Sequence, residues 1–290
     1  MRAFLLELLR CPNCERDPLS TDGSDPETTK VLRCPGCGAS YAVRDGIPEL
    51  LLGDSVLARP ADGPAPDARV LRGTGAAEQR AYWESDSAHR PVDHPMVKAF
   101  AEQRWRHLSR LFPLDRISTA LDVGSGSGFS TLYLPRTITP VACDGSRLML
   151  QRNPCPDRVL VDAQVLPFKS EAFDLVFCWE LLHHVAEPWR AVAEMARVSR
   201  RWVVWFEPNP LNVAQFLFAL ADPEHRWVLR FSKRYVLEQV RRAGLELVVH
   251  QRGGVVFPNR TPERLRFLAS LPFRVPFVGI SHLVIARRPA

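Results

Sequence analysis

The chain is poor in lysine and contains no dense run of basic residues. Lysine occurs at only four of its 290 positions, so arginine supplies most of the positive charge behind a formal net charge of +6. The nearest approach to a basic run is Arg197, Arg200 and Arg201, which we interpret as part of a solvated face. A dedicated nucleic-acid-binding chain is therefore not indicated, although the excess charge is compatible with RNA or anionic lipid as a partner.

Long uncharged apolar runs are also missing. No stretch reaches the roughly 18 residues that a membrane-spanning helix requires. The apolar run at the N-terminus is short and is broken by Glu7, which argues against a secretion signal. Residues 267–286 are interrupted by Pro272, Arg274, Pro276 and His282. We therefore expect a cytoplasmic protein without a transmembrane segment, in which 290 residues form one large core and a small additional module.

Four of the seven cysteines follow a spacing that is typical of metal sites. Cys11 and Cys14 form one C-x2-C pair, and Cys34 and Cys37 form a second pair after nineteen intervening residues. This spacing predicts a zinc ribbon, in which four thiolates surround one ion and leave no position open. The zinc is therefore expected to be structural, since a segment of this size buries too little apolar surface to fold alone. Disulfides and a rubredoxin-like iron site are the alternatives.

The other three cysteines show no such spacing. Cys143, Cys155 and Cys178 are expected to behave as small buried apolar residues. Cys178 ends an apolar stretch close to the candidate site, so a nucleophilic role is the alternative for this residue. Nothing near it in the sequence indicates an activating base.

Alternating glycines follow the end of an apolar stretch in residues 120–128, which read Ala-Leu-Asp-Val-Gly-Ser-Gly-Ser-Gly. Gly124, Gly126 and Gly128 allow a sharp turn and a close approach of the backbone to a ligand. The spacing departs from the G-x-G-x-x-G of dinucleotide sites because the third glycine comes one residue early. Asp122 precedes the turn, and a carboxylate suits a cationic amino group better than a phosphate.

Acidic residues end the next two apolar stretches. Asp144 follows Val-Ala-Cys about 20 residues beyond the glycines, where a ribose hydroxyl pair needs an acceptor. Asp162 ends the stretch that begins at Val159, and residues 173–178 form a fourth apolar stretch. Asp is also common at strand ends because turns favour it, so each acid alone is a weak signal.

In these features residues 95–250 resemble the class I S-adenosylmethionine-dependent methyltransferases, specifically the type-11 or UbiE-like group. The resemblance implies a Rossmann-like doubly wound sheet that binds S-adenosylmethionine. It assigns the ribose to Asp144, the adenine amino group to Asp162 and the methionine part to the residues after the fourth strand. The cofactor-binding residues that we expect are Asp122, Gly124, Ser125, Gly126, Gly128, Asp144, Gly145, Ser146, Asp162, Ala163, Trp179 and Glu180.

The N-terminal cysteine segment resembles the zinc-ribbon activator that partners several tRNA, rRNA and protein methyltransferases, here fused to its enzyme. We predict a zinc ribbon over residues 1–56, a linker over 57–76 and the methyltransferase domain over 77–290. Strands alternating with helices predict the parallel sheet, with helices over 96–112, 129–134, 232–243 and after Pro188. Residues 245–250 and 280–286 are expected to form an antiparallel edge.

Three residues beyond the cofactor set are candidates for catalysis. His183 and His184 follow the fourth strand, and imidazole accepts a proton near neutral pH. Glu207 follows the fifth strand, where its carboxylate is placed to receive a proton from the acceptor. The alternatives are that the histidines pack or cap the next helix and that Glu207 starts a turn enforced by two prolines. Methyl transfer mainly requires positioning and exclusion of water, so a dedicated base is not essential.

One further motif is missing, and its absence bears on which atom of the acceptor is methylated. The chain lacks the Asn/Asp-Pro-Pro-aromatic loop typical of enzymes that methylate exocyclic base nitrogens, so oxygen or carbon acceptors are favoured. Two segments, residues 210–230 and 253–279, are rich in apolar side chains. They predict a lid over a pocket for a small-molecule or lipid-like acceptor. Core packing is the alternative for about half of their aromatic residues. Tyr82 and Trp83 are further candidates for this cover. An RNA methyltransferase that uses the ribbon for recognition is the alternative function, and a degenerate partner-binding module is a third; the sequence leaves the oligomeric state open.

Overall fold

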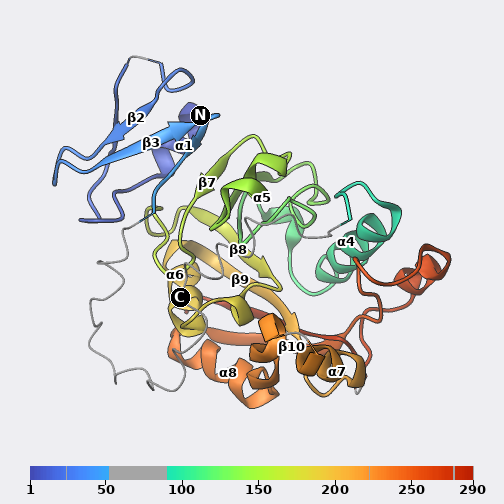
Figure 1. The fold of residues 1–290 in the computed structure, drawn as a ribbon. Helices are drawn as coiled ribbons and strands as arrows, with labels where there is room; N and C mark the ends of the chain where they lie inside the picture. Colours follow the sequence, from blue (N-terminus) through green and yellow to red (C-terminus); the bar gives the residue numbers. More distant parts are fainter. Residues whose placement is uncertain (24, 52–89, 222, 277, 290) are drawn as a thin grey trace.

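Two β-sheets organise the part of the chain that the computed structural model describes, residues 1–23, 25–51, 90–221, 223–276 and 278–289 (Figure 1). The small sheet has the strand order β1-β2-β3-β4 and belongs to the N-terminal ribbon. The linker expected at 57–76, together with Tyr82 and Trp83, lies outside the described residues. The ribbon consists of α1 (Ala3–Leu8), β1 (Ser20–Thr21), β2 (Val31–Arg33), β3 (Ser40–Arg44) and β4 (Ile47–Pro48).

The large sheet has seven strands in the order β10-β11-β9-β8-β5-β6-β7. Strands β5 to β9 pair in parallel, whereas β11 is antiparallel to both β9 and β10. This arrangement confirms the predicted doubly wound sheet with its antiparallel edge. The strands are β5 (Thr119–Val123), β6 (Thr139–Asp144), β7 (Arg158–Leu160), β8 (Phe173–Trp179), β9 (Ser199–Pro208), β10 (Glu246–Gly253) and β11 (Ser281–Arg287).

The order of the strands reverses between β5 and β8, where consecutive crossovers run to opposite sides. In open α/β sheets ligands bind beyond the carboxyl ends of the strands at such a switch point. The glycine loop after β5 and the segment after β8 meet there, because a Cβ on Gly124 would lie 2.6 Å from Leu181 Cδ1. The topology therefore brings two of the predicted cofactor segments together.

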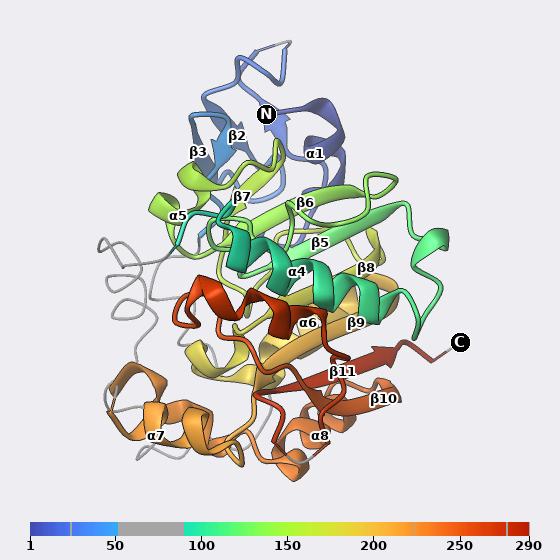
Figure 2. The ribbon, with the colours of Figure 1, turned by 90° about the vertical axis from the view of Figure 1, so that its right-hand side faces the viewer.

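Helices cover both faces of the large sheet, and strand alternation explains how. Leu175 and Phe177 of β8 pack with α4 (Pro95–Leu108) on one face, whereas Val176 and Cys178 pack with α6 (Pro188–Val198) on the other. Figure 2 shows α4 and η4 (Glu263–Ser270) lying across the first face. The remaining helices are η1 (Leu114–Arg116), α5 (Arg147–Arg152), η2 (Leu182–His184), α7 (Val213–Ala221), η3 (Pro223–Arg230) and α8 (Lys233–Arg242). No helix among these described residues is both long and apolar enough to cross a bilayer.

The predicted helix ends are confirmed at two helices. Pro188 occupies the first turn of α6, and Ser232 Oγ accepts a hydrogen bond from Tyr235 N at the start of α8. Gly244, just beyond the end of α8, has a left-handed φ of 66°.

The short helix expected over residues 129–134 is wrong, since this segment forms turns. Ser130 and Thr131 donate their hydroxyl hydrogens to Asp122 Oδ2, at 2.5 Å each. Pro135 then limits the segment, because the residue before a proline disfavours the helical conformation. Side-chain hydrogen bonds to Asp122 therefore replace a helix that would be too short to be stable by itself.

The ribbon packs against the β7 edge of the large sheet (Figure 1). Leu50 N donates to Leu160 O at 2.9 Å, and Glu49 forms a parallel bridge with Leu160. On the other side of the contact, Leu9 and Phe168 form an antiparallel bridge. Apolar residues of the ribbon belong to the same buried cluster as residues of β7. The ribbon thus covers a sheet edge that would otherwise expose unpaired backbone groups.

Candidate functional site

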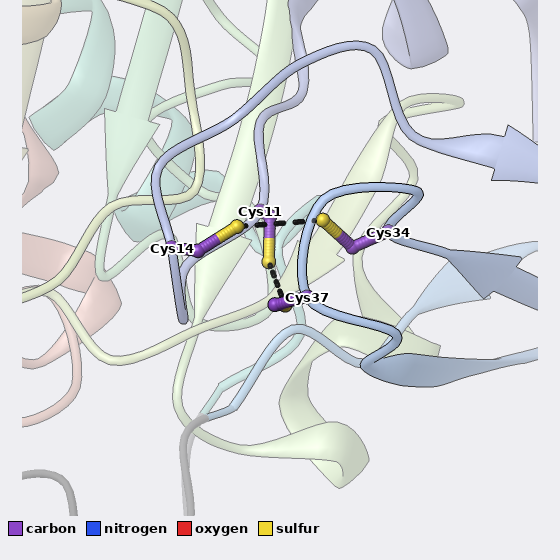
Figure 3. Close-up of side chains that lie close together, drawn as sticks. All are labelled: Cys11, Cys14, Cys34 and Cys37. Carbon is purple, nitrogen blue, oxygen red and sulfur yellow. Dashed lines mark hydrogen bonds between the residues drawn. The ribbon is translucent and has the colours of Figure 1, made fainter.

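The four predicted metal ligands come together in the ribbon (Figure 3). All four sulfur atoms lie within 4.8 Å of one another, with Cys11 Sγ 3.7 Å from Cys37 Sγ and Cys14 Sγ 3.4 Å from Cys34 Sγ. A disulfide requires about 2.05 Å, so the disulfide alternative is not supported, and all seven cysteines are free. Four convergent sulfur ligands fit a tetrahedral thiolate site for zinc.

Local turns aim these sulfur atoms at one point. In each C-x2-C pair the residue after the second cysteine donates its N–H to the carbonyl of the first, Glu15 to Cys11 at 2.8 Å and Gly38 to Cys34 at 2.9 Å. Both residues have a left-handed φ, 63° and 74°, which glycine adopts more readily than glutamate. Tyr41 OH lies 3.1 Å from Cys11 Sγ and supplies an outer contact of the kind that orients metal ligands.

The glycine loop forms a cradle after β5. The N–H groups of Gly124 and Ser125 donate to Cys143 O at 2.9 and 3.0 Å, which ties the loop to β6. Gly126 has a φ of 51°, and a Cβ placed on it would meet no atom within 4 Å. Gly128 is different, since a Cβ there would lie 2.6 Å from Asn153 Oδ1. Gly126 therefore lines open space, whereas Gly128 permits close packing of the protein against itself.

Asp144 is held beside this cradle by two backbone N–H groups. Its Oδ2 accepts from Gly126 N and its Oδ1 from Ser146 N, both at 2.8 Å. The residue is half-buried. The structure thus places Asp144, the predicted ribose acceptor, next to the glycine loop.

Asp162 follows β7 and has one oxygen without a partner. Its Oδ1 accepts from Gln164 N at 2.8 Å, whereas its Oδ2 is buried and has no hydrogen-bond partner among the described residues. A buried acceptor without a donor is costly, so a ligand with an N–H group would complete it. Ala163, next in the chain, is half-buried. An adenine amino group is such a donor, and the site therefore fits the nucleoside that the sequence implies.

Asp122 lies beneath the loop rather than on its surface. It is buried, and burial raises the pKa of its carboxyl to about 7 although the Ser130 and Thr131 hydroxyls oppose this shift. Its Oδ2 accepts both hydroxyl hydrogen bonds, and its Oδ1 has no partner among the described residues. Asp122 therefore fixes the shape of the loop, and its contact with the cofactor stays a prediction.

Three small residues that the sequence analysis assigned to the cofactor have structural contacts. Ser125 Oγ accepts from Asn153 Nδ2 at 3.1 Å, and Ser146 Oγ accepts from Met149 N at the start of α5. A Cβ on Gly145 would lie 3.6 Å from the carbonyl oxygen of Val161. These residues support the two loops, and their own contact with a ligand stays a prediction.

An ion pair that the sequence analysis missed lies at the end of β8. Arg104 of α4 is only 1% exposed, and its Nη2 donates to Glu180 Oε1 at 3.0 Å and to Ser281 Oγ at 2.8 Å. Its guanidinium carbon lies 3.6 Å from the ring centre of Phe100 and 4.6 Å from that of Phe206. Burial lowers the pKa of Arg104 to about 10, so the side chain stays charged at neutral pH.

Glu180, the predicted contact for the methionine part, is thereby fixed in place. Its backbone has a left-handed φ of 60°, and its N–H donates to Phe206 O at 2.8 Å. A non-glycine residue in this conformation is strained and is often found at functional sites. Its neighbour Trp179 is buried among aromatic rings, with its ring centre 5.2 Å from that of Phe206 and 5.3 Å from that of Trp105. The side chain of Trp179 thus packs in the core next to Glu180.

The structure brings the candidate catalytic residues His183 and Glu207 into direct contact. His183 Nδ1 lies 2.8 Å from Glu207 Oε2, and Leu182 N donates to Glu207 Oε1 at 2.6 Å. Burial raises the pKa of Glu207 to about 8, although the N–H groups of Leu182 and His183 oppose this shift. Glu207 is fully buried, so it holds the η2 turn rather than starting an exposed turn after β9.

His184 lies at the same turn but is half-buried. Its ring centre is 4.0 Å from that of His183. A small pocket next to this turn is lined by His183, Phe231 and Tyr235 together with residues of α6 and η3. The two histidines therefore differ in access, and His184 is the more exposed of the pair.

The remaining cysteines are buried, as predicted. Burial raises the pKa of Cys155 to about 11 and raises those of Cys143 and Cys178 as well. A thiol with a raised pKa is a poor nucleophile at neutral pH. The structure therefore gives no support to a nucleophilic Cys178.

Two segments of the chain match known family models. Residues 121–202 match the family model described as methyltransferase domain, and residues 2–46 match the one described as Trm112p-like protein. These matches confirm the resemblances predicted from the glycine loop and from the cysteine spacing.

Curated relatives match part of the chain. Demethylmenaquinone methyltransferase of Renibacterium salmoninarum is 37% identical over 118 residues, which cover 38% of this chain and 48% of that protein. Phthiotriol/phenolphthiotriol dimycocerosates methyltransferase 1 of Mycobacterium ulcerans is 31% identical over 159 residues, which cover 51% of this chain and 57% of that protein. The chain thus spans about half the length of these curated relatives.

Solved structures share the fold of the large sheet. A SAM-dependent methyltransferase from Thermotoga maritima superposes with a TM-score of 0.52 at 18% identity, and the alignment covers 67% of this chain and 92% of that one. At this identity the likeness concerns the fold alone. It agrees with the Rossmann-like methyltransferase sheet that the sequence predicted.

Proposed function

We propose that this chain is an S-adenosylmethionine-dependent methyltransferase that acts on a small-molecule or lipid-like acceptor, with transfer to oxygen or carbon favoured. The observation that carries the proposal is the carboxylate of Asp144, which two backbone N–H groups hold beside the open space over Gly126. The match of residues 121–202 to the methyltransferase domain supports the same activity.

The residues of the cradle divide the binding of S-adenosylmethionine among them. Asp144 would accept hydrogen bonds from the ribose hydroxyls, and Asp162 Oδ2 would accept one from the adenine amino group. Gly126 would allow close approach of the backbone, and Glu180 would face the methionine part. When bound, S-adenosylmethionine supplies an electrophilic methyl group on a sulfonium. The protein's contribution is to position the acceptor and exclude water.

A hydroxyl or acidic carbon must release its proton when the new bond to the methyl group forms. We assign Glu207 a positioning role, since its buried carboxyl group holds the η2 turn through Leu182 N and His183 Nδ1. His184 is the half-buried member of the turn and is our candidate to receive the proton, with His183 second to it.

We place the methyltransferase domain at residues 77–290. Within this domain, the segments proposed to contact the acceptor are residues 210–230 and 253–279. Within them, Phe273 is buried in the core, as is Phe231 directly after the first segment, whereas Phe216 and Phe267 are exposed, and Phe277 lies outside the described residues. The two curated relatives are named for a demethylmenaquinone and for phthiotriol-type dimycocerosates, which supports a lipid-like acceptor over the RNA alternative.

The ribbon completes the proposal as a structural zinc module. Cys11, Cys14, Cys34 and Cys37 would hold one zinc ion, and the ribbon would then brace β7, whose following residues include Asp162. The contact through Leu50 and Leu160 transmits this support directly to the strand.

The test is a methyl-transfer assay with radiolabelled S-adenosylmethionine. Organic-phase label from a demethylated quinol or a lipid extract would support the proposal, and label in an RNA fraction would instead support the alternative function. Absence of label in every fraction, together with absence of S-adenosylmethionine binding, would reject the proposed activity.

A further inference from the structure

Helix α7 presents large apolar side chains to solvent, and its buried residues are Gln215 and Ala219. Val213 is 72% exposed and Leu217 is 58% exposed, whereas Gln215 between them is 6% exposed. The inner side of α7 is held by amide hydrogen bonds, from Gln215 Nε2 to Ile280 O at 3.2 Å and from Asn212 Nδ2 to Val278 O at 2.6 Å. A surface helix of a water-soluble domain normally shows the opposite arrangement.

The exposed apolar residues form one surface, which we call the α7 face. It consists of Leu211, Val213, Phe216, Leu217 and Leu220, all of them exposed among the described residues. Residues 208–221 contain no charged side chain. Single exposed apolar residues are ordinary, but five on one short helix and its leading turn indicate a contact surface.

Basic residues lie beside this face. Residues 260–274 contain four arginines, all exposed, and a single acidic residue, Glu263. Arg260 places this segment against α7, because its guanidinium carbon lies 4.1 Å from the ring centre of Phe218. Figure 1 shows α7 and η4, which belongs to this segment, on the same side of the molecule. Arg260 therefore places positive charge beside α7, and the same segment carries three further exposed arginines.

The α7 face also lies at the edge of the sheet where the candidate site is found. Helix α7 follows β9, whose end carries Glu207, and the backbone of Asn209 is bonded to Ile280 O. The α7 face therefore follows closely on the end of β9 that carries Glu207.

We infer that α7 docks the protein on the surface of an anionic lipid bilayer. The apolar side chains of the α7 face enter the boundary between head groups and acyl chains, and the arginines of residues 260–274 contact the anionic head groups. The inference rests on the proposed lipid-like acceptor, which the docked enzyme would receive from the bilayer. Charge complementarity and the inverted polarity of α7 favour a lipid surface over a second copy of the chain.

Co-sedimentation with lipid vesicles tests this inference on the full-length protein without S-adenosylmethionine. We expect binding to vesicles of mixed phosphatidylglycerol and phosphatidylcholine, and weaker binding to phosphatidylcholine alone. Val213→Glu and Leu217→Glu should each lower the partition coefficient by about tenfold, because each removes an apolar side chain from the lipid. Arg264→Gln should lower it about fivefold on anionic vesicles only.

The matched control is Leu247→Glu. Leu247 is 45% exposed on β10, at the end of that strand where it pairs with Ala286, away from the segment that meets α7. This variant should bind vesicles like the native protein. Equal binding of native protein and Leu217→Glu, or no vesicle binding at all, would overturn the inference. A native dimer that Leu217→Glu dissociates would assign the face to a second copy and would also overturn it.

Calorimetric titration of the same preparations with S-adenosylmethionine separates the two proposals. Variants of the α7 face that still bind S-adenosylmethionine while losing vesicle binding leave the proposed activity standing. Native protein that binds vesicles but not S-adenosylmethionine would reject the proposed activity and keep a lipid-docking surface.

Discussion

On the β5, β6 and β7 side of the large sheet, the polar groups of the site are held by residues close to them in the sequence. Asp122 is bonded to Ser130, and Asp144 to Gly126, across 8 and 18 positions. On the β8, β9 and β11 side the partners are far apart, since Arg104 is bonded to Glu180 across 76 positions and to Ser281 across 177. The first side is therefore built by local loops, and the second depends on the complete fold.

This difference assigns separate tasks to the two sides. The local side carries the features that suit a nucleoside, and the ribbon braces it at β7. The other side combines a buried ion pair, the pair of His183 with Glu207 and the exposed α7 face. A substitution on the local side should thus disturb binding of the nucleoside part of the donor. One on the other side should disturb the methionine part, the acceptor or the stability of the fold, and the following predictions address the two sides.

Removal of a metal ligand should have the largest effect. Cys34→Ser is expected to release zinc and unfold the ribbon, because metal binding supplies on the order of 10 kcal/mol to such sites. Elemental analysis and thermal melting measure both consequences. Cys155→Ser is the matched control, since Cys155 is buried outside the cluster and bonded to Asp157 O. Full zinc content and an unchanged melting temperature in Cys34→Ser would show that the cluster holds no structural metal.

Breaking the ion pair between Arg104 and Glu180 should have the next largest effect. Arg104→Met leaves the carboxylate of Glu180 without its cation and should lower the free energy of unfolding by about 3 kcal/mol. Urea unfolding measures this loss. The double variant with Glu180→Gln should regain part of it because no unpaired charge remains. A double variant that is less stable than Arg104→Met would contradict the assigned pairing.

A methyl group added at Gly126 should weaken the binding of S-adenosylmethionine. It should lower the stability of the protein less than Arg104→Met does. Gly126→Ala places a Cβ in the open space and should weaken S-adenosylmethionine binding by about 100-fold, or about 2.7 kcal/mol. Its positive φ should cost about 1 kcal/mol of stability as well. Gly244→Ala carries the same strain, with a φ of 66° and nothing within 4 Å, but lies at the end of α8. Equal donor affinity in the two variants would place the ligand elsewhere.

The last prediction concerns the pH dependence that the buried carboxyl group of Glu207 gives to stability. Because its folded pKa of about 8 is raised above its unfolded value, the folded state keeps this proton while the unfolded state loses it. Native stability should therefore fall as the pH rises from about 4.5 to about 8. Glu207→Gln lacks this term, so its stability relative to the native protein should increase over the same range. Urea unfolding at both ends of the range measures the difference, and a constant difference would contradict the buried, protonated carboxyl.

The sequence signals of the local side each lie within a short segment, so their arrangement could be read from spacing. In the structure the four cysteine sulfurs converge, Asp144 accepts from Gly126 N and Asp162 accepts from Gln164 N, whereas the role of these residues in binding stays a prediction. The helix expected over 129–134 failed since nothing in the spacing showed that Ser130 and Thr131 would bind Asp122.

The distant side was less predictable because its contacts join separate elements. The sequence indicates His183 and Glu207 as two separate candidates. In the folded chain the parallel pairing of Trp179 with Phe206 brings the segments that follow them together, and the two side chains then meet. Arg104 lies four residues after Phe100 on the buried stripe of α4, so spacing alone could have placed it inside. An arginine at such a position is ordinarily assigned to solvent, and its partners Glu180 and Ser281 become visible only in the folded chain.

Calorimetric titration with S-adenosylmethionine of the native protein and of Asp144→Ala tests the central claim most directly. We expect one site per chain in the native protein and about 100-fold weaker binding in the variant, because two hydrogen bonds to a charged acceptor are lost. No binding by the native protein, or equal binding by both proteins, would contradict the assignment of the cradle.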